Sequence, residues 1–149
     1  MKNDNVHILL VEDNKYDVIA FERAIKERTA SNPIHIARDG VEALEFLRGE
    51  GGRERISQPY VVLLDLNMNR MNGFEFLEEI RKDEALQQSI VFVLTTSEAD
   101  LDKTKAYNHH VAGYLSKNDA GTKFLNVFET LEAFCANVHF PSNGTDGVC

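Results

Sequence analysis

Three carboxylates stand directly after short apolar runs of the sequence. Glu12 and Asp13 follow HILLV at 7–11, and Asp65 follows YVVLL at 60–64. If these runs are parallel strands, the three side chains meet at the sheet edge where open α/β folds bind ligands. Clustered carboxylates repel one another, and a hard divalent cation such as Mg²⁺ or Mn²⁺ offsets that repulsion. No cluster of histidine and cysteine accompanies them, so the pattern does not favour zinc.

Two later apolar runs place a hydroxyl and an ammonium at the same edge. Thr95 follows IVFVL at 90–94, and Lys117 comes shortly after AGYL at 112–115. Taken singly, Thr95 is typical of any strand and Lys117 of a solvated surface. Beside the acids and a metal, however, they could hold a phosphoryl group in transfer. Asp65 is then the available nucleophile, and the product would be an aspartyl phosphate.

The apolar runs alternate with segments of helical periodicity, as at Val41, Leu44 and Leu47. The segment Leu101–His109 is the least amphipathic of them. Strands that alternate regularly with helices predict an α/β class, in which a parallel sheet is doubly wound between two helical layers. The run at 60–64 has no polar alternation and is expected at the centre of the sheet, while Ile34–Ala37 alternates and is expected at an edge.

The composition is typical of one globular domain. The chain has 149 residues, of which 43% are hydrophobic and 27% charged, and we expect one domain over 1–140 with a flexible tail at 141–149. A net charge of -8 argues against nucleic acid or an anionic membrane as a partner. No apolar stretch is long enough to span a membrane, and Cys135 and Cys149 have no paired spacing. We therefore expect a cytoplasmic protein.

Four motifs in order resemble the receiver domains of two-component response regulators. They are VEDN at 11–14, LLDLNMNRMNG at 63–73, LTTS at 94–97 and GYLSK at 113–117. The resemblance extends over residues 6–137 and implies a flavodoxin-like (βα)5 sandwich with strand order 2-1-3-4-5. Within the family, the long loop RGEGGRERISQP and the phrase DLNM look most like single-domain regulators paired with cyanobacterial phytochrome kinases.

The resemblance implies a phosphoacceptor and a metal site. Asp65 would receive a phosphoryl group from a histidine kinase. Mg²⁺ would be bound by Asp13, by Asp65 and by the backbone carbonyl of Asn67, while Glu12 would be bound through water. The family's chemistry is limited to self-phosphorylation from a donor and self-dephosphorylation, so the chain is not expected to be an enzyme in the ordinary sense.

The resemblance also implies a switch. Thr95 and Tyr114 would move together on phosphorylation, and Lys117 would contact the phosphoryl group; Tyr114 alone would be read as a half-buried packing residue. Two positions depart from the family, because Asn69 and Asn118 stand where proline is usual. A cis bond before a residue other than proline costs about 3–4 kcal/mol, so the bond before Asn118 is expected to be trans, or strained for function.

Two other functions use similar residues. A Mg²⁺-dependent phosphohydrolase also forms an aspartyl phosphate, but it carries its nucleophile and a second acid as DxD after the first strand. Here Glu12 and Asp13 are adjacent and the nucleophile follows the third strand. A pseudo-receiver that only binds proteins would typically have lost the acceptor or an acid, and this sequence keeps them all.

The last periodic segment is more apolar than one buried face requires. Its apolar residues are Phe124, Leu125, Phe128, Leu131, Phe134 and Cys135. We therefore predict a homodimer that uses this helix and the segment Phe134–Pro141. The signal is expected to leave through a protein surface, toward a downstream protein target.

Overall fold

The computed structural model of the protein describes residues 6–27, 32–66, 68, 71–95, 100–117 and 125–141. Five parallel strands form one sheet in the order β2-β1-β3-β4-β5, which confirms the predicted class and strand order. The strands are β1 (His7–Val11), β2 (Ile34–Ala37), β3 (Tyr60–Asp65), β4 (Ile90–Thr95) and β5 (Gly113–Ser116). The helices are α1 (Lys15–Lys26), α2 (Gly40–Arg48), α3 (Gly73–Lys82), α4 (Asp100–Asn108) and α5 (Leu125–Asn137).

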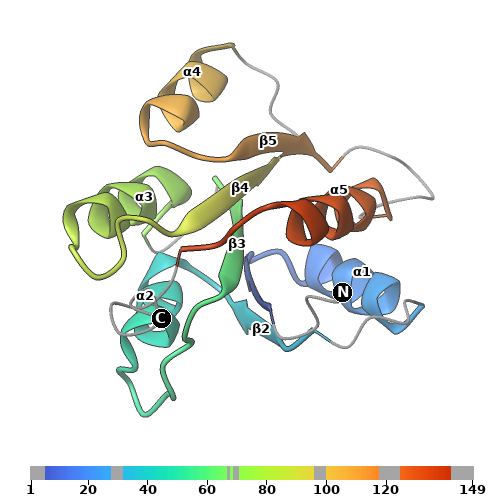
Figure 1. The fold of residues 1–149 in the computed structure, drawn as a ribbon, viewed down its shortest axis with the longest axis horizontal. Coiled ribbons are helices and arrows are strands. Elements are labelled where there is room, and N and C mark those ends of the chain that lie inside the picture. Colours follow the sequence, from blue (N-terminus) through green and yellow to red (C-terminus); the bar gives the residue numbers. More distant parts are fainter. Residues whose placement is uncertain are drawn as a thin grey trace.

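The sheet lies between two helical layers, with α2 and α3 on one face and α1 and α5 on the other (Figure 1). Successive strand residues point to opposite faces. In β3, Val62 and Leu64 pack toward α2 and α3, whereas Val61 and Leu63 pack toward α1 and α5. All six residues of β3 are buried, as expected for a central strand. Within the described residues, no helix has both the length and the apolar character that crossing a membrane requires.

The helix caps fix the loops that follow the strands. Asn14 caps α1, because its side chain accepts hydrogen bonds from the backbone of Tyr16 and Asp17. Asn72 caps α3 and forms a reciprocal capping box with Glu75. Because of these caps, α1 begins directly after the two acids that follow β1, and α3 begins soon after β3.

Gly73 lets the start of α3 approach the end of β3. A Cβ at this position would lie 2.7 Å from Cα of Leu66 and 2.8 Å from the backbone oxygen of Asp65. No side chain fits into that space, so glycine is required by close packing rather than by its backbone angles. The backbone N–H of Gly73 donates to the carbonyl of Leu66 at 3.1 Å, which closes the loop after the strand.

The expected element boundaries were close to the observed ones. β3 and β4 each extend one residue further than predicted and so include Asp65 and Thr95, and the weakly amphipathic segment does form α4. Phe76 of α3 is a fully buried core residue that the sequence patterns did not identify. Of the predicted tail at 141–149, only Pro141 lies within the described residues.

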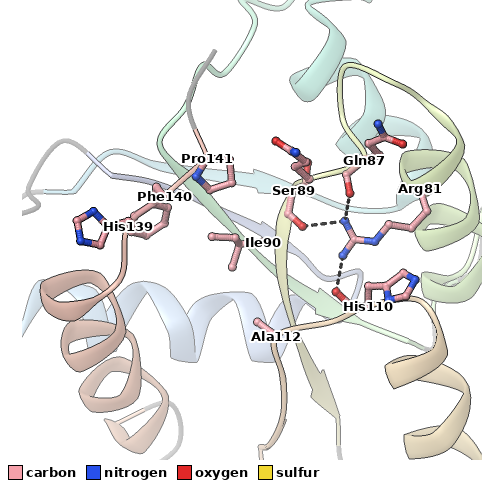
Figure 2. A pocket seen from close by; sticks show the side chains of 10 residues that line it. Arg81, Gln87, Ser89, Ile90, His110, Ala112, His139, Phe140 and Pro141 are labelled. Atoms are coloured by element: carbon pink, nitrogen blue, oxygen red, sulfur yellow. Dashed lines mark hydrogen bonds between the residues drawn. The ribbon is translucent and has the colours of Figure 1, made fainter. Parts of the chain in front are cut away.

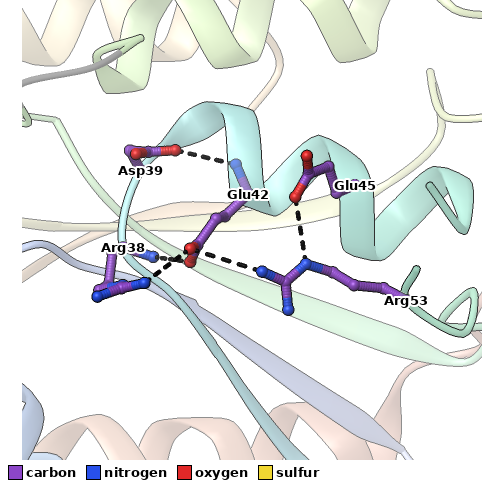
Figure 3. A network of polar contacts seen from close by, with 5 residues as sticks. All are labelled: Arg38, Asp39, Glu42, Glu45 and Arg53. Carbon is purple, nitrogen blue, oxygen red and sulfur yellow. Dashed lines mark hydrogen bonds and ion pairs between the residues drawn. The ribbon is translucent and has the colours of Figure 1, made fainter. Parts of the chain in front are cut away.

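The long loop between α2 and β3 is bound to α2 through Arg53 (Figure 3). Its guanidinium is 3.2 Å from a carboxylate oxygen of Glu45 and 3.5 Å from one of Glu42. It also lies 4.5 Å from the ring centre of Phe46. Arg38 reaches the same Glu42 carboxylate at 3.2 Å. The long loop is therefore attached to α2.

Arg81 joins two turns at the edge of the sheet opposite the acids. Its guanidinium donates to the backbone carbonyls of Gln87 and Ser89, both at 2.8 Å, of His109 at 2.7 Å and of His110 at 2.9 Å. Figure 2 shows the guanidinium between these segments, beside an open hollow of about 560 Å³. The backbone oxygens of the two histidines thus connect the turn after α4 to the turn after α3.

We expect Arg81→Met to destabilise the protein by about 3–5 kcal/mol, because it removes four charge-assisted hydrogen bonds to backbone carbonyls, two of them partly buried, while keeping most of the aliphatic stem. Urea unfolding measures this loss. Arg23→Met, at an exposed position of α1, is the matched control and should change the free energy of unfolding by less than about 0.5 kcal/mol. A loss below about 1 kcal/mol for Arg81→Met would contradict the expectation.

Several apolar residues of α5 pack against the core of the same chain. The ring of Phe134 stands edge-on to Phe92 at 5.0 Å and to Phe140 at 5.8 Å. Cys135 is half-buried against the same core. Phe124 and the side chain of Leu125 lie outside the described residues. Phe134 is therefore half-buried against the core of its own chain, so it does not by itself require a partner.

Candidate functional site

The three predicted acids come together at the carboxyl edge of β1 and β3. Val11 pairs with Leu64, so the ends of the two strands stand side by side. One carboxylate oxygen from each of Glu12, Asp13 and Asp65 lies within 4.8 Å of the others. Glu12 and Asp65 are buried and Asp13 is partly exposed, so the cluster opens to solvent on the Asp13 side.

Lys117, the first residue after β5, reaches the same cluster. Its ammonium is 2.9 Å from Oε1 of Glu12 and 2.9 Å from Oδ2 of Asp17. The Lys117 side chain is only 6% exposed, so both ion pairs are shielded from water. The sequence predicted that Lys117 lies at the same edge of the sheet as the acids, and in the structure its ammonium contacts Glu12 there.

The burial of the cluster changes its titration. The pKa of Glu12 is raised to about 7, because burial and the nearby charge of Asp65 raise it by more than the hydrogen bond from Lys117 lowers it. Burial by itself lowers the pKa of Lys117, but hydrogen bonds to Glu12 and Asp17 outweigh that effect and the pKa is raised. Near neutral pH, Lys117 is therefore charged, while Glu12 is poised between its two protonation states.

The donor set suits a hard divalent cation. The cluster offers carboxylate oxygens, and within the described residues it includes no histidine or cysteine. One lysine faces Glu12, Asp17 and the charge of Asp65, so negative groups outnumber positive ones. A cation such as Mg²⁺ or Mn²⁺ would supply the missing charge and hold Glu12 in its ionised form.

Of the remaining predicted residues, the structure describes Tyr114 and the backbone of Thr95. Thr95 ends β4 beside Asp65, since Asp65 pairs with the preceding Leu94, but its side chain lies outside the described residues. Tyr114 is half-buried and packs against the core between the sheet and α2, α3 and α4. Asn67 and the two asparagines that replace the usual prolines, Asn69 and Asn118, also lie outside the described residues.

Asp17 was missed by the sequence reasoning. It is buried on the first turn of α1 and pairs with Lys117. The signal was present, because Asp17 stands four residues before Phe21 and therefore on the buried stripe of that helix. An acid on an apolar stripe requires a buried partner, and only the tertiary structure identifies that partner as Lys117.

Comparisons with known proteins agree with this geometry. The model of the response regulator receiver domain matches residues 8–129. Response regulator Rcp1 of Synechocystis sp. is 36% identical over 127 residues, which cover 85% of this chain and 86% of Rcp1.

Two solved structures are also similar. The phosphorylated cyanobacterial phytochrome response regulator RcpA has a TM-score of 0.82 and 34% identity, and the match covers 93% of this chain and 99% of RcpA. The Mn²⁺-bound form of Rcp1 has a TM-score of 0.75 and 33% identity, covering 92% and 99%. The chain therefore belongs to the response regulator receiver domains, the signalling modules of two-component phosphorelays.

Proposed function

We propose that this receiver domain, over residues 1–140 with a tail at 141–149, accepts a phosphoryl group on Asp65 from a histidine kinase. The observation that carries the proposal is the buried Lys117 ammonium beside the acids at the carboxyl edge of the sheet. A receiver domain is a signalling protein rather than a classical enzyme. We propose that its own chemistry is limited to gaining and losing this phosphoryl group.

In the proposed reaction, a carboxylate oxygen of Asp65 attacks the phosphorus of the donor. An oxygen–phosphorus bond forms, the bond from phosphorus to the donor nitrogen or oxygen breaks, and the leaving group keeps the electron pair and takes a proton. Water later attacks the adduct, which returns Asp65 and inorganic phosphate. Asp65 suits this role because it ends a buried, central strand, and the start of α3 packs closely against its backbone at Gly73.

The surrounding groups would stabilise the charge of the transferring group. We propose that Asp13, Asp65 and the carbonyl of Asn67 hold Mg²⁺, with Glu12 bound through water. The cation would neutralise the phosphoryl oxygens. Lys117 would donate to one of these oxygens.

The proposed response to phosphorylation involves Thr95 and Tyr114. The Thr95 hydroxyl would turn toward the new phosphoryl oxygen, and the Tyr114 ring would move into the space released. The half-buried position of Tyr114 at the core supports a ring that can change its packing.

Incubation with acetyl phosphate and Mg²⁺, followed by intact-mass measurement, tests the function. A single adduct that hydrolyses slowly is the expected result. Continuous release of phosphate over many turnovers would instead identify a phosphohydrolase, and the absence of any adduct would identify a pseudo-receiver. Either of these results would overturn the proposal.

We predict that Asp13→Ala weakens Mn²⁺ binding by about tenfold or more, and more than Glu12→Ala does, because direct ligation contributes more than ligation through water. Titration followed by the paramagnetic resonance of free Mn²⁺ measures both affinities. Glu22→Ala, which removes an exposed acid of α1, is the control and should bind like the wild type. Equal losses for Asp13→Ala and Glu12→Ala would contradict the ranking.

The kinase partner is proposed from the similarity of the chain to regulators of phytochrome systems. RcpA is described as a phytochrome response regulator, and the match covers nearly the whole of both chains. We propose that the phosphoryl donor of this chain is a phytochrome-type histidine kinase, and that the output is contact with a downstream protein.

We also propose a homodimer through α5 and the segment Phe134–Pro141. Because Phe134 packs internally, the residue that supports an interface is Val138, an apolar side chain that is 38% exposed at the end of α5. We predict that Val138→Asp shifts the protein toward monomer, as measured by sedimentation with and without acetyl phosphate and Mg²⁺. Thr130→Asp, at another exposed position of α5, should leave association unchanged; a monomeric wild type under all conditions would contradict the dimer.

A further inference from the structure

Asp17 is a buried acid that the proposed reaction does not use. Its carboxylate lies on the first turn of α1, and its side chain is 11% exposed. Its oxygen Oδ2 accepts a hydrogen bond from the Lys117 ammonium at 2.9 Å. This contact links helix α1 to the residue after β5, across the end of the sheet that carries the acids.

Lys117 is shared between two anionic groups. An ammonium has three N–H donors, and Lys117 directs one to Glu12 and one to Asp17, each at 2.9 Å. Both bonds are buried, where ion pairs are stronger than in water. The position of Lys117 is therefore set by two carboxylates, one just after β1 and one on α1.

A phosphoryl group on Asp65 would be a third anionic partner for Lys117. A bound cation would draw Glu12 toward itself and weaken the hold of Glu12 on the ammonium. The hydrogen bond from Lys117 to Asp17 would not be weakened in this way, because no oxygen of Asp17 is among the three that cluster as possible metal ligands. Asp17 is therefore the group that competes with the phosphoryl oxygens for Lys117.

We propose that Asp17 is a positioning residue that restrains Lys117, so that the ammonium must leave Asp17 before it can bind a phosphoryl group on Asp65. This inference rests on the proposed function of Asp65. The proposal predicts that removing the charge of Asp17 increases the affinity for a phosphoryl group. Removing an acid with a purely structural role would instead decrease this affinity or leave it unchanged.

The test is an equilibrium titration with beryllium fluoride, a tetrahedral phosphoryl mimic, at saturating Mg²⁺. Asp17→Asn keeps the size of the side chain and an acceptor oxygen, and we expect it to tighten the affinity for the mimic by about fivefold or more. Glu22→Gln removes one charge from an exposed position of the same helix and should change the affinity by less than about twofold. Equal affinities for Asp17→Asn and wild type would overturn the proposal.

A double-variant cycle tests whether the effect passes through Lys117. In a Lys117→Met background there is no ammonium to restrain, so adding Asp17→Asn should leave the affinity for the mimic unchanged. If Asp17→Asn tightens or restores binding in that background, Asp17 acts on the mimic by direct charge repulsion and not through Lys117, and the proposal fails. A wild type that neither binds the mimic nor forms an adduct would instead show that the proposed function of Asp65 is wrong.

One measurement needs no variant. In the wild type with Mg²⁺ and beryllium fluoride bound, a crystal structure should place the Lys117 ammonium beyond ion-pair distance from Asp17. An ammonium that stays at its present 2.9 Å from Asp17 while it contacts the mimic would overturn the restraint. This result decides the matter even if Asp17→Asn does not fold.

Discussion

Asp65→Asn is expected to abolish the phosphoryl adduct that forms with acetyl phosphate and Mg²⁺. The substitution removes the nucleophilic oxygen but keeps the size of the side chain at the end of β3. It also removes a negative charge that raises the pKa of Glu12, so the acid cluster loses repulsion and the fold should remain stable. Intact mass measures the adduct, and thermal unfolding measures the fold.

The control for this prediction is Glu78→Gln, which makes an equivalent change at an exposed position of α3. It should label like the wild type. If Asp65→Asn is folded and still gains one phosphoryl group, peptide mapping would locate another acceptor, and the assignment of Asp65 would have to be withdrawn.

Lys117→Met is expected to cause the largest loss of stability among the site substitutions. It leaves Glu12 and Asp17 buried without the ammonium that both contact at 2.9 Å. Breaking a buried ion pair by removing one partner typically costs about 3–5 kcal/mol. Urea unfolding of metal-free protein at neutral pH measures the loss. Lys82→Met, which removes an exposed lysine with a 3.9 Å contact to Glu79, should cost less than about 0.5 kcal/mol.

The loss should depend on pH in a defined direction. In the wild type, the pKa of Glu12 is about 7 when folded against an ordinary value of 4.5, so the folded protein binds more protons between these values. Stability therefore falls as pH rises through this window. Without Lys117 the pKa of Glu12 should rise further, and the fall should continue above neutral pH. The variant should be closest to wild type near about pH 5 and furthest from it near about pH 8; a difference that does not change with pH would contradict this account.

Most of the fold follows from local sequence patterns. The apolar runs and the helical spacing between them predict alternating strands and helices, and alternation of that kind permits few topologies other than a doubly wound sheet. The central position of β3 follows from its uninterrupted apolar residues, all of which are buried. The exact end of β4 did not follow, because the pairing of Thr95 with Ser116 depends on a strand far along the chain.

The site residues that directly follow strands could be predicted from the sequence. Those that pair with a residue of another helix or strand were harder to predict. Glu12, Asp13 and Asp65 were placed by their positions after β1 and β3. Asp17 lies within a helix, and its buried partner Lys117 is 100 residues away in sequence. Similarly, Arg81 carries no motif, because its partners are backbone carbonyls that any residue could provide.

The apolar excess of α5 shows a different difficulty. Its pattern correctly indicated more hydrophobic surface than one helix face can bury against a sheet. The pattern did not indicate that the chain returns after the helix, so that Phe140 covers Phe134. Sequence periodicity gives the amount of apolar surface, whereas the segment that covers it is decided by tertiary structure.

The complete burial of β3 has a consequence for local unfolding. A strand that is paired on both sides and covered on both faces should exchange its amide hydrogens only when the whole domain opens. Asp65 is the last residue of that strand, so the proposed acceptor is attached to the part of the molecule expected to open last. Repeated gain and loss of a phosphoryl group would then leave β3 unchanged. The motions that transmit a signal would arise in the elements around β3, whose amide hydrogens are less protected against exchange.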